Sequence, residues 1–156
     1  MQGLGGMGSG GHGMGSDELR RLPRKRQPFG LSLPCTYVYC RDGDTPVISI
    51  TGGIKWAIRL IGVDCPELGE LGGHAAAEYA DAVLSISGGC LSVEIPAPHD
   101  IIHPLKSLTF DRLPGFIWIG PDKTINELII KTGHGTLADG WQLPMGGNND
   151  ENGSAA

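Results

Sequence analysis

The 156-residue chain contains 26 glycines and has a formal net charge of −5, and its length suits one compact domain rather than two. No apolar run approaches the roughly 20 residues needed to cross a bilayer, so the sequence predicts no membrane-spanning helix. The N-terminus lacks the basic-then-apolar pattern of a secretory leader, and four scattered cysteines are too few for a disulfide framework. We therefore expect a soluble, monomeric protein without a membrane partner, in a reducing intracellular (cytoplasmic) setting.

Both ends of the chain are poor in apolar residues. Residues 1–15 are mostly glycine with interspersed Met and Ser, and residues 145–156 have a similar composition, so neither stretch buries enough surface to offset its ordering entropy. A basic run, RRLPRKR at 20–26, is either a solvated tail or a mobile phosphate-binding arm. The sequence thus predicts a disordered arm over residues 1–33, a folded domain over 34–141 and a disordered tail over 142–156.

Five short strands are expected in the folded part, because segments rich in β-branched and aromatic residues alternate with glycine turns. They cover residues 36–40, 47–50, 56–63, 91–95 and 116–119. The pair Asp42-Gly43 is a hairpin signal between the first two. In the third strand, alternation places Trp56, Ile58 and Leu60 on one face and Arg59 on the other.

Two segments have a helical period instead. The first covers Gly73–Ser87 and places its apolar stripe at four positions, Ala75, Tyr79, Val83 and Ile86. The second begins after Thr124, with Glu127 three residues on as a capping box, and ends at Gly133. The order β-β-β-α-β-β-α predicts a mainly β, α+β fold. Its expected form is a five-stranded OB-type barrel with one helix between strands 3 and 4 and another after strand 5.

Most of the suggestive side chains fall in three segments. These are DGDT at 42–45, RLIGVDCPE at 59–67, and Asp111-Arg112. Each alone is ordinary: a turn, a solvated strand end and a surface ion pair. Together, with the helix start at 73–76 and INELII at 125–130, they resemble the thermonuclease (staphylococcal nuclease-like) family over residues 37–138, in the family's order and spacing.

The resemblance implies a calcium-dependent endonuclease that hydrolyses phosphodiester bonds of DNA and RNA and leaves 3′-phosphate ends. Its Ca²⁺ ligands would be Asp44, Asp64 and the backbone carbonyl of Cys65. The implied catalytic residues are Arg59 and Arg112, which grip the phosphate, and Glu67, the general base toward the attacking water. Oxygen ligands suit Ca²⁺, and the planar guanidinium suits a phosphate.

The chain departs from the family pattern in several places. Cys65 stands where the family has Thr or Ala, and Asp111 stands where it favours Gly, which puts a carboxylate next to Arg112. No helical pattern follows the second helix, where the family has a third. Trp141 is a candidate for stacking on a substrate base, or it caps the open end of the core.

Two other functions are compatible with the sequence. A catalytically weakened barrel that binds nucleic acid or a protein partner would fit the acidic composition. A zinc module would need Cys35, Cys40, His99 and His103, whose spacing is wider than in finger modules. His74 and His134 lie at the expected helix ends, where a local hydrogen bond explains them.

Overall fold

The computed structural model describes residues 21–26, 30–96 and 111–144. The strands are β1 (Leu31–Pro34), β2 (Thr36–Cys40), β3 (Pro46–Ser49), β4 (Lys55–Leu60), β5 (Val63–Asp64), β6 (Leu91–Ile95), β7 (Arg112–Ile119), β8 (Lys123–Thr124) and β9 (Thr136–Leu137). The helices are α2 (Gly73–Ile86) and α3 (Ile125–Lys131), with short 3-10 turns η1 (Thr51–Gly53) and η2 (Gly88–Cys90). In the described ranges, no helix is long and apolar enough to span a bilayer.

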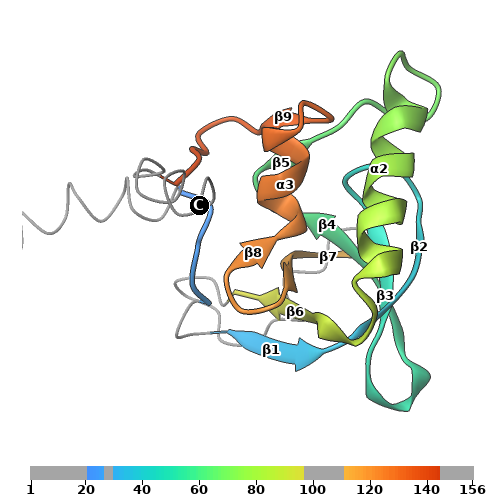
Figure 1. Ribbon diagram of the computed structural model, residues 1–156, viewed down its shortest axis with the longest axis vertical. Helices are drawn as coiled ribbons and strands as arrows, with labels where there is room; N and C mark the ends of the chain where they lie inside the picture. Colours follow the sequence, from blue (N-terminus) through green and yellow to red (C-terminus); the bar gives the residue numbers. More distant parts are fainter. Residues whose placement is uncertain (1–20, 27–29, 97–110, 145–156) are drawn as a thin grey trace, which may run out of the picture.

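The strands form a mixed sheet in the order β1-β6-β7-β4-β3-β2, with β8 added to β7, and a separate ribbon of β5 and β9 (Figure 1). Strands β4 and β7 run parallel, and the other neighbours run antiparallel. The mainly β, α+β class is therefore confirmed. Among the described residues these pairings form an open path and do not record the closed five-stranded barrel that the sequence predicts.

The two edges of this path are consecutive in the chain. Only Cys35 separates β1 from β2, and its N–H donates to the carbonyl of Leu91 in β6 at 3.1 Å. One nearly continuous strand thus begins along β6 at one end of the path and continues along β3 at the other.

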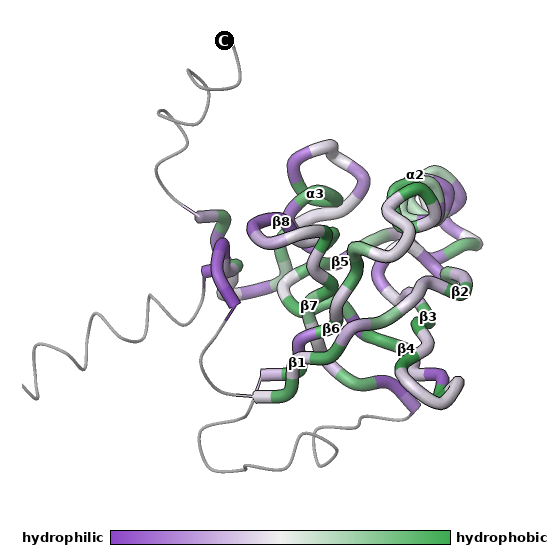
Figure 2. Tube along the Cα trace, turned by 60° about the horizontal axis from the view of Figure 1, so that its bottom comes forward, coloured by the Kyte–Doolittle hydropathy of each residue, from purple (hydrophilic) through white to green (hydrophobic). Residues whose placement is uncertain are grey.

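The main core lies between the sheet and the two helices, and Figure 2 shows hydrophobic stretches in β3, β4 and β7 at the centre of the molecule. The predicted alternation in β4 is confirmed, because Ile58 and Leu60 are buried whereas Arg59 is half-exposed on the other face. Burying each such apolar side chain contributes roughly 1.5–3 kcal/mol relative to leaving it exposed.

Helix α2 forms where the sequence predicts it, but the predicted apolar stripe is only half right, because Tyr79 and Val83 pack against the core whereas Ala75 and Ile86 do not. The buried side is lined by Gly73, Ala76, Ala80 and Leu84. Ala75 is exposed, and 85 % of the Ile86 surface is accessible. The buried side is thus shifted by about one residue from the predicted stripe, and small residues take several of its positions.

A second apolar cluster covers the other face of β7. Leu22, Phe116 and Trp118 are buried there, and Trp141 and Leu143 pack against them. The Leu22 N–H donates to the carbonyl of Gln142 at 2.9 Å. Residues 21–26, from the stretch expected to be an arm, are thus attached to the domain by a buried leucine.

Candidate active site

The turn at residues 42–45 lies against helix α2 and the strand end at Cys65. Gly43 permits this approach, because a Cβ at its position would lie 2.7 Å from the Ala76 Cβ and 2.9 Å from the Cys65 Sγ. The turn delivers Asp44 to the base of β3, where its carbonyl accepts the Leu60 N–H at 2.9 Å. The DGDT and RLIGVDCPE segments therefore meet at the end of β4.

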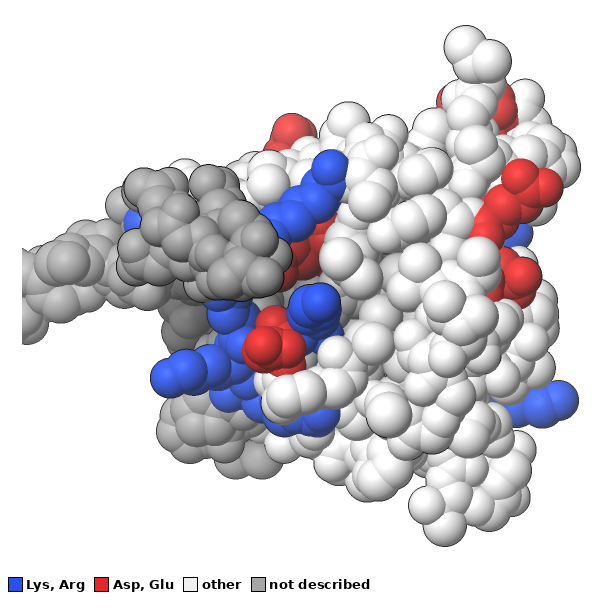
Figure 3. Space-filling view, in the orientation of Figure 1, with Lys and Arg blue, Asp and Glu red and all other residues white. Residues whose placement is uncertain are grey.

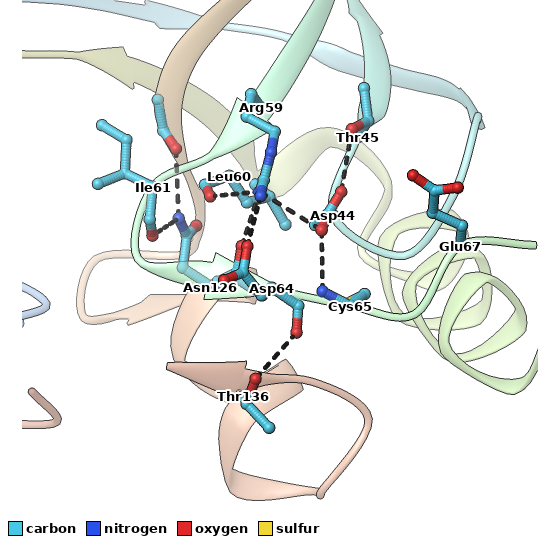
Figure 4. Close-up of polar contacts among 12 residues, drawn as sticks. Asp44, Thr45, Arg59, Leu60, Ile61, Asp64, Cys65, Glu67, Asn126 and Thr136 are labelled. Carbon is cyan, nitrogen blue, oxygen red and sulfur yellow. Dashed lines mark hydrogen bonds and ion pairs between the residues drawn. The ribbon is translucent and has the colours of Figure 1, made fainter. Parts of the chain in front are cut away.

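Arg59 joins the two predicted metal ligands (Figure 4). Its Nη2 donates to Asp64 Oδ1 at 2.7 Å, and its Nη1 lies 3.4 Å from Asp44 Oδ2. Nη1 also donates to the carbonyls of Val63 at 2.6 Å and Leu60 at 3.1 Å. These bonds fix the guanidinium between the carboxylates, so the structure brings Asp44, Arg59 and Asp64 together as the sequence predicts.

The Asp44 carboxylate is deeply set, with only 7 % of the residue exposed. It accepts hydrogen bonds from the Cys65 N–H at 2.9 Å and the Thr45 hydroxyl at 3.1 Å. Burial raises the pKa of Asp44, and its hydrogen bond with Asp42 adds to the rise, while the Cys65 N–H and Arg59 oppose it. The protein thus keeps a carboxylate in a place that disfavours its charge, which is typical of functional sites.

The donor set fits a hard divalent cation. Asp44 and Asp64 supply two carboxylates against the single guanidinium of Arg59. The neighbouring Asp42 adds negative charge beside Asp44, and Asp42 Oδ1 is buried with no hydrogen-bond partner in the described part of the chain. Oxygen donors with surplus negative charge are what Ca²⁺ prefers. No group of three or more His, Cys, Asp or Glu side chains in a metal-binding arrangement occurs in the described residues. The predicted ligand set, two carboxylates and a main-chain oxygen, contains only two such side chains.

The Cys65 thiol lies beside the same carboxylates. Burial raises its pKa to about 12, and the charges of Asp44 and Asp42 add to the effect. The thiol is therefore protonated at neutral pH, which makes it a poor nucleophile and slow to oxidise.

Glu67 lies in the loop between β5 and α2, and its backbone is held by Glu70. The Glu67 N–H donates to the Glu70 carboxylate at 2.7 Å, and the Glu70 N–H donates to the Glu67 carbonyl at 2.8 Å. A Cβ on Gly73 would overlap that same carbonyl, so the helix start requires glycine there. The Glu67 carboxylate is exposed and makes no ion pair or hydrogen bond within the described ranges; no dashed line reaches it in Figure 4. Sequence reasoning missed this contact of Glu70.

Arg112 is the first residue of β7. It lies opposite Ala57 in the parallel pair with β4, two residues from the level of Arg59, so both arginines project from one face of the sheet. Strand geometry puts their Cα atoms roughly 8 Å apart. Arg112 is half-buried and forms no ion pair with a described residue. Asp111 pairs instead with Arg41, at 2.8 Å, and so does not take Arg112 as its partner.

Asn126 fixes the chain that leads into Asp64, a role that sequence reasoning missed. The fully buried amide of α3 donates to the carbonyls of Ile61 at 3.0 Å and Gly115 at 3.2 Å, and its oxygen accepts the Ile117 N–H at 3.2 Å. An asparagine inside the apolar segment INELII was the available signal, because a buried amide needs partners. The N-cap was predicted correctly: Thr124 accepts the Glu127 N–H at 3.1 Å. The Glu127 side chain pairs with Lys131 rather than forming the second half of a capping box.

The remaining candidates lie outside this cluster. Trp141 packs on the second apolar cluster and against Gly62, which agrees with capping the core; base stacking stays a prediction. His134 stacks on Tyr79 at 4.3 Å and lies 2.9 Å from the Thr132 hydroxyl, the local bond expected for it. The zinc alternative is untested, because His99 and His103 lie outside the described residues.

The basic segment 21–26 lies on another side of the sheet. Arg26 is placed over the Trp118 ring at 5.4 Å and donates to the Ser32 hydroxyl at 2.8 Å. Figure 3 shows Lys and Arg side chains gathered where this segment lies, while much of the remaining view has few charges. This part of the predicted arm is packed against the domain.

The sequence matches no known protein-family model, and a search of curated proteins found no match.

Proposed function

We propose that the protein is a thermonuclease-like, calcium-dependent endonuclease that hydrolyses phosphodiester bonds of DNA and RNA and leaves 3′-phosphate ends. One observation carries the proposal: Arg59 contacts Asp44 and Asp64 while Arg112, from a distant segment, projects from the same sheet face. Acids that suit a cation and arginines that suit a phosphate are thereby concentrated at one end of the sheet.

The proposal includes the fold. We propose an OB-type barrel in which the run from β1 into β2 closes the sheet, because its two halves pair with β6 and β3 respectively. The element order, with α2 before β6 and α3 after β7, supports this arrangement. In OB-type barrels ligands bind across strands 2 and 3 and the neighbouring loops, which here contain Asp44, Arg59 and Asp64.

Asp44, Asp64 and the Cys65 carbonyl would hold the cation, which when bound supplies Lewis-acid polarisation of a phosphoryl oxygen. Arg59 and Arg112 bind the non-bridging oxygens of the phosphate and stabilise the charge that accumulates on them, because guanidinium groups stay protonated and bind oxygens in pairs. Because Arg59 already contacts Asp64, its guanidinium must divide its N–H donors between that carboxylate and the phosphate.

Glu67 acts on the water. Its exposed carboxylate accepts a proton as the water oxygen attacks phosphorus in line with the 5′-oxygen. The new P–O bond forms as the P–O5′ bond breaks, and the departing 5′-oxygen is protonated by solvent. Glu70 holds the Glu67 backbone during this step and serves as a positioning residue.

The test is cleavage of plasmid DNA and of single-stranded RNA by the full chain in calcium, in magnesium and in chelator. We expect calcium-dependent cleavage that Arg112→Ala and Glu67→Gln each reduce by about 10²–10³-fold, the usual effect of removing one transition-state contact. Lys123→Gln, an exposed cation on β8, is the matched control and should keep full activity. Circular dichroism must show unchanged folding; wild-type rates in either site variant would refute the assignment.

The second candidate is a barrel that binds nucleic acid without cleaving it. It is favoured by the contacts of Arg59, because its guanidinium is already held by two carboxylates and two carbonyls. A mobility shift of intact strands in calcium would support this function over the nuclease.

A further inference from the structure

A second group of basic and aromatic side chains lies on the same sheet face as the two site arginines. Across β2, β3, β4 and β7 the register places Tyr39 opposite Val47, Val47 opposite Ala57, and Ala57 opposite Arg112. Residues paired in this way project to one side of a sheet, so Tyr39 faces the same way as Arg112.

Two cations extend this row. Lys55 is two residues before Ala57 in β4, as Arg59 is two residues after it, and alternation puts all three on one face. Lys55 and Arg59 are roughly 13 Å apart along the strand, so they reach different parts of a long ligand. Arg41 follows β2, two residues beyond Tyr39, and it is exposed.

Tyr39, Arg41 and Lys55 line one depression of about 470 Å³, which also includes Asp111. Tyr39 is 48 % exposed, so one face of its ring is open to a ligand. The Asp111 carboxylate, 65 % exposed, closes one side by its 2.8 Å ion pair with Arg41. Hydrogen bonds to Asp111 and to Tyr39 raise the pKa of Arg41, so its guanidinium stays charged.

An exposed aromatic ring between cations matches the chemistry of single-stranded nucleic acid, whose bases stack and whose phosphates pair with cations. The local charge is notable because the chain as a whole has a net charge of −5. An exposed ion pair such as Arg41–Asp111 is worth little in water, so a phosphate can replace the carboxylate at small cost.

We propose that this face is a binding track for single-stranded nucleic acid that extends the hydrolytic site. Tyr39 stacks on a base, and Arg41 and Lys55 bind phosphates beyond the one held by Arg59 and Arg112. Asp111 competes for Arg41 and weakens the track. The position of the scissile phosphate rests on the proposed function; the track itself does not depend on hydrolysis.

The experiment measures binding of fluorescein-labelled octathymidylate to the full chain by anisotropy in chelator, where cleavage is absent, with unlabelled dithymidylate as competitor. The double variant Arg41→Gln/Lys55→Gln should weaken octathymidylate binding at least tenfold. It should also lower the slope of log affinity against log salt by about 1.4, because each phosphate contact on a single strand contributes about 0.7. Its effect on dithymidylate should stay within twofold.

Three further variants sharpen the test. Tyr39→Ala should weaken octathymidylate roughly tenfold while Tyr39→Phe binds as wild type, because stacking needs the ring and not the hydroxyl. Asp111→Asn should tighten binding severalfold. Lys123→Gln, the matched cation in β8, should change affinity by less than twofold.

The track would be overturned if the affinity for octathymidylate did not change in the variants of Tyr39, Arg41 and Lys55, or if the wild-type chain did not bind octathymidylate. The two proposals fail separately. Cleavage in calcium, with binding that the variants do not change, rejects only the track. Binding that the variants weaken, without cleavage, rejects only the nuclease.

Discussion

Two polar clusters lie on either side of the turn at Ile61-Gly62, and they differ in how they tolerate burial. On one side, the side-chain amide of Asn126 hydrogen-bonds to three main-chain groups, so neither its nitrogen nor its oxygen lacks a partner. On the other side, the carboxylates of Asp44 and Asp64 share one guanidinium, and one carboxylate oxygen of the neighbouring Asp42 is buried without a partner among the described residues. The first cluster is neutral and complete; the second has surplus negative charge.

This difference distinguishes Asn126, which stabilises the fold, from the acidic cluster, which is suited to binding a ligand. A satisfied buried amide stabilises a unique arrangement of β7, α3 and the turn before Asp64. A cluster with surplus charge destabilises the fold, which evolution tolerates where a ligand of opposite charge completes it. A mutation of Asn126 should therefore lower stability, whereas a mutation in the acidic cluster should lower activity.

The largest effect is expected for Arg59→Lys. An ammonium group cannot keep the four oxygen contacts of the planar guanidinium, so turnover should fall by about 100-fold or more while the melting temperature changes little. Cleavage rates in calcium measure the change. Arg41→Lys, tested on a short substrate, is the control and should stay within threefold. Near-normal turnover in Arg59→Lys would mean that the cluster is not catalytic.

On the other side of the turn, Asn126→Ala should show the reverse pattern. It leaves the Ile117 N–H and the Ile61 carbonyl without this partner and takes one of two donors from the Gly115 carbonyl, which should lower the free energy of unfolding by about 2–4 kcal/mol. Urea unfolding measures the loss, with Glu78→Gln on the exposed side of α2 expected within about 0.5 kcal/mol of wild type. A loss as small as that of the control would show that the hydrogen bonds of Asn126 are dispensable.

A smaller effect of opposite sign is expected for Asp44→Asn. The pKa of Asp44 is raised in the folded protein, so the fold binds this proton more tightly than the unfolded chain does. The contribution of Asp44 to the unfolding free energy therefore falls as pH rises from its unfolded pKa of about 3.9 through its folded pKa. In chelator at pH 7 the variant should be the more stable protein, and the difference should shrink toward pH 4.

Calcium should reverse that order. It should raise the melting temperature of the wild type and leave Asp44→Asn unchanged, because a cation that binds only the folded state stabilises it. A wild type that gains nothing from calcium would contradict the metal site.

The smallest effect concerns the thiols. Cys90 is exposed, whereas burial raises the pKa of Cys35 and Cys40 to about 11 and that of Cys65 to about 12. At pH 8 an alkylating reagent should modify Cys90 first, with the other three reacting only after unfolding. Mass spectrometry of digested samples locates the label. Equal rates at Cys65 and Cys90 would show that the acidic cluster is more open than its geometry indicates.

The resemblance in the sequence located Asp44, Arg59 and Asp64, and their meeting followed from strand order and local signals. A hairpin pair of Asp and Gly, an alternating strand and a helix with its N-cap are short-range features, so the chain specifies them locally. Part of the packed side of α2 was missed, because Ala76 lies against Gly43. Gly43 is distant in the sequence, so the helical period does not reveal this contact.

The sequence by itself determined the two helices, the main strands and their order, but not the short strands β1, β5, β8 and β9. The tertiary structure alone decided which charges meet: that Asp111 pairs with Arg41, that Arg59 bridges two carboxylates and that Asn126 supports the turn before Asp64. The physical reason is range. Secondary structure depends on residues a few positions apart, whereas ion pairs and buried hydrogen bonds depend on atoms that approach within about 3 Å from distant segments.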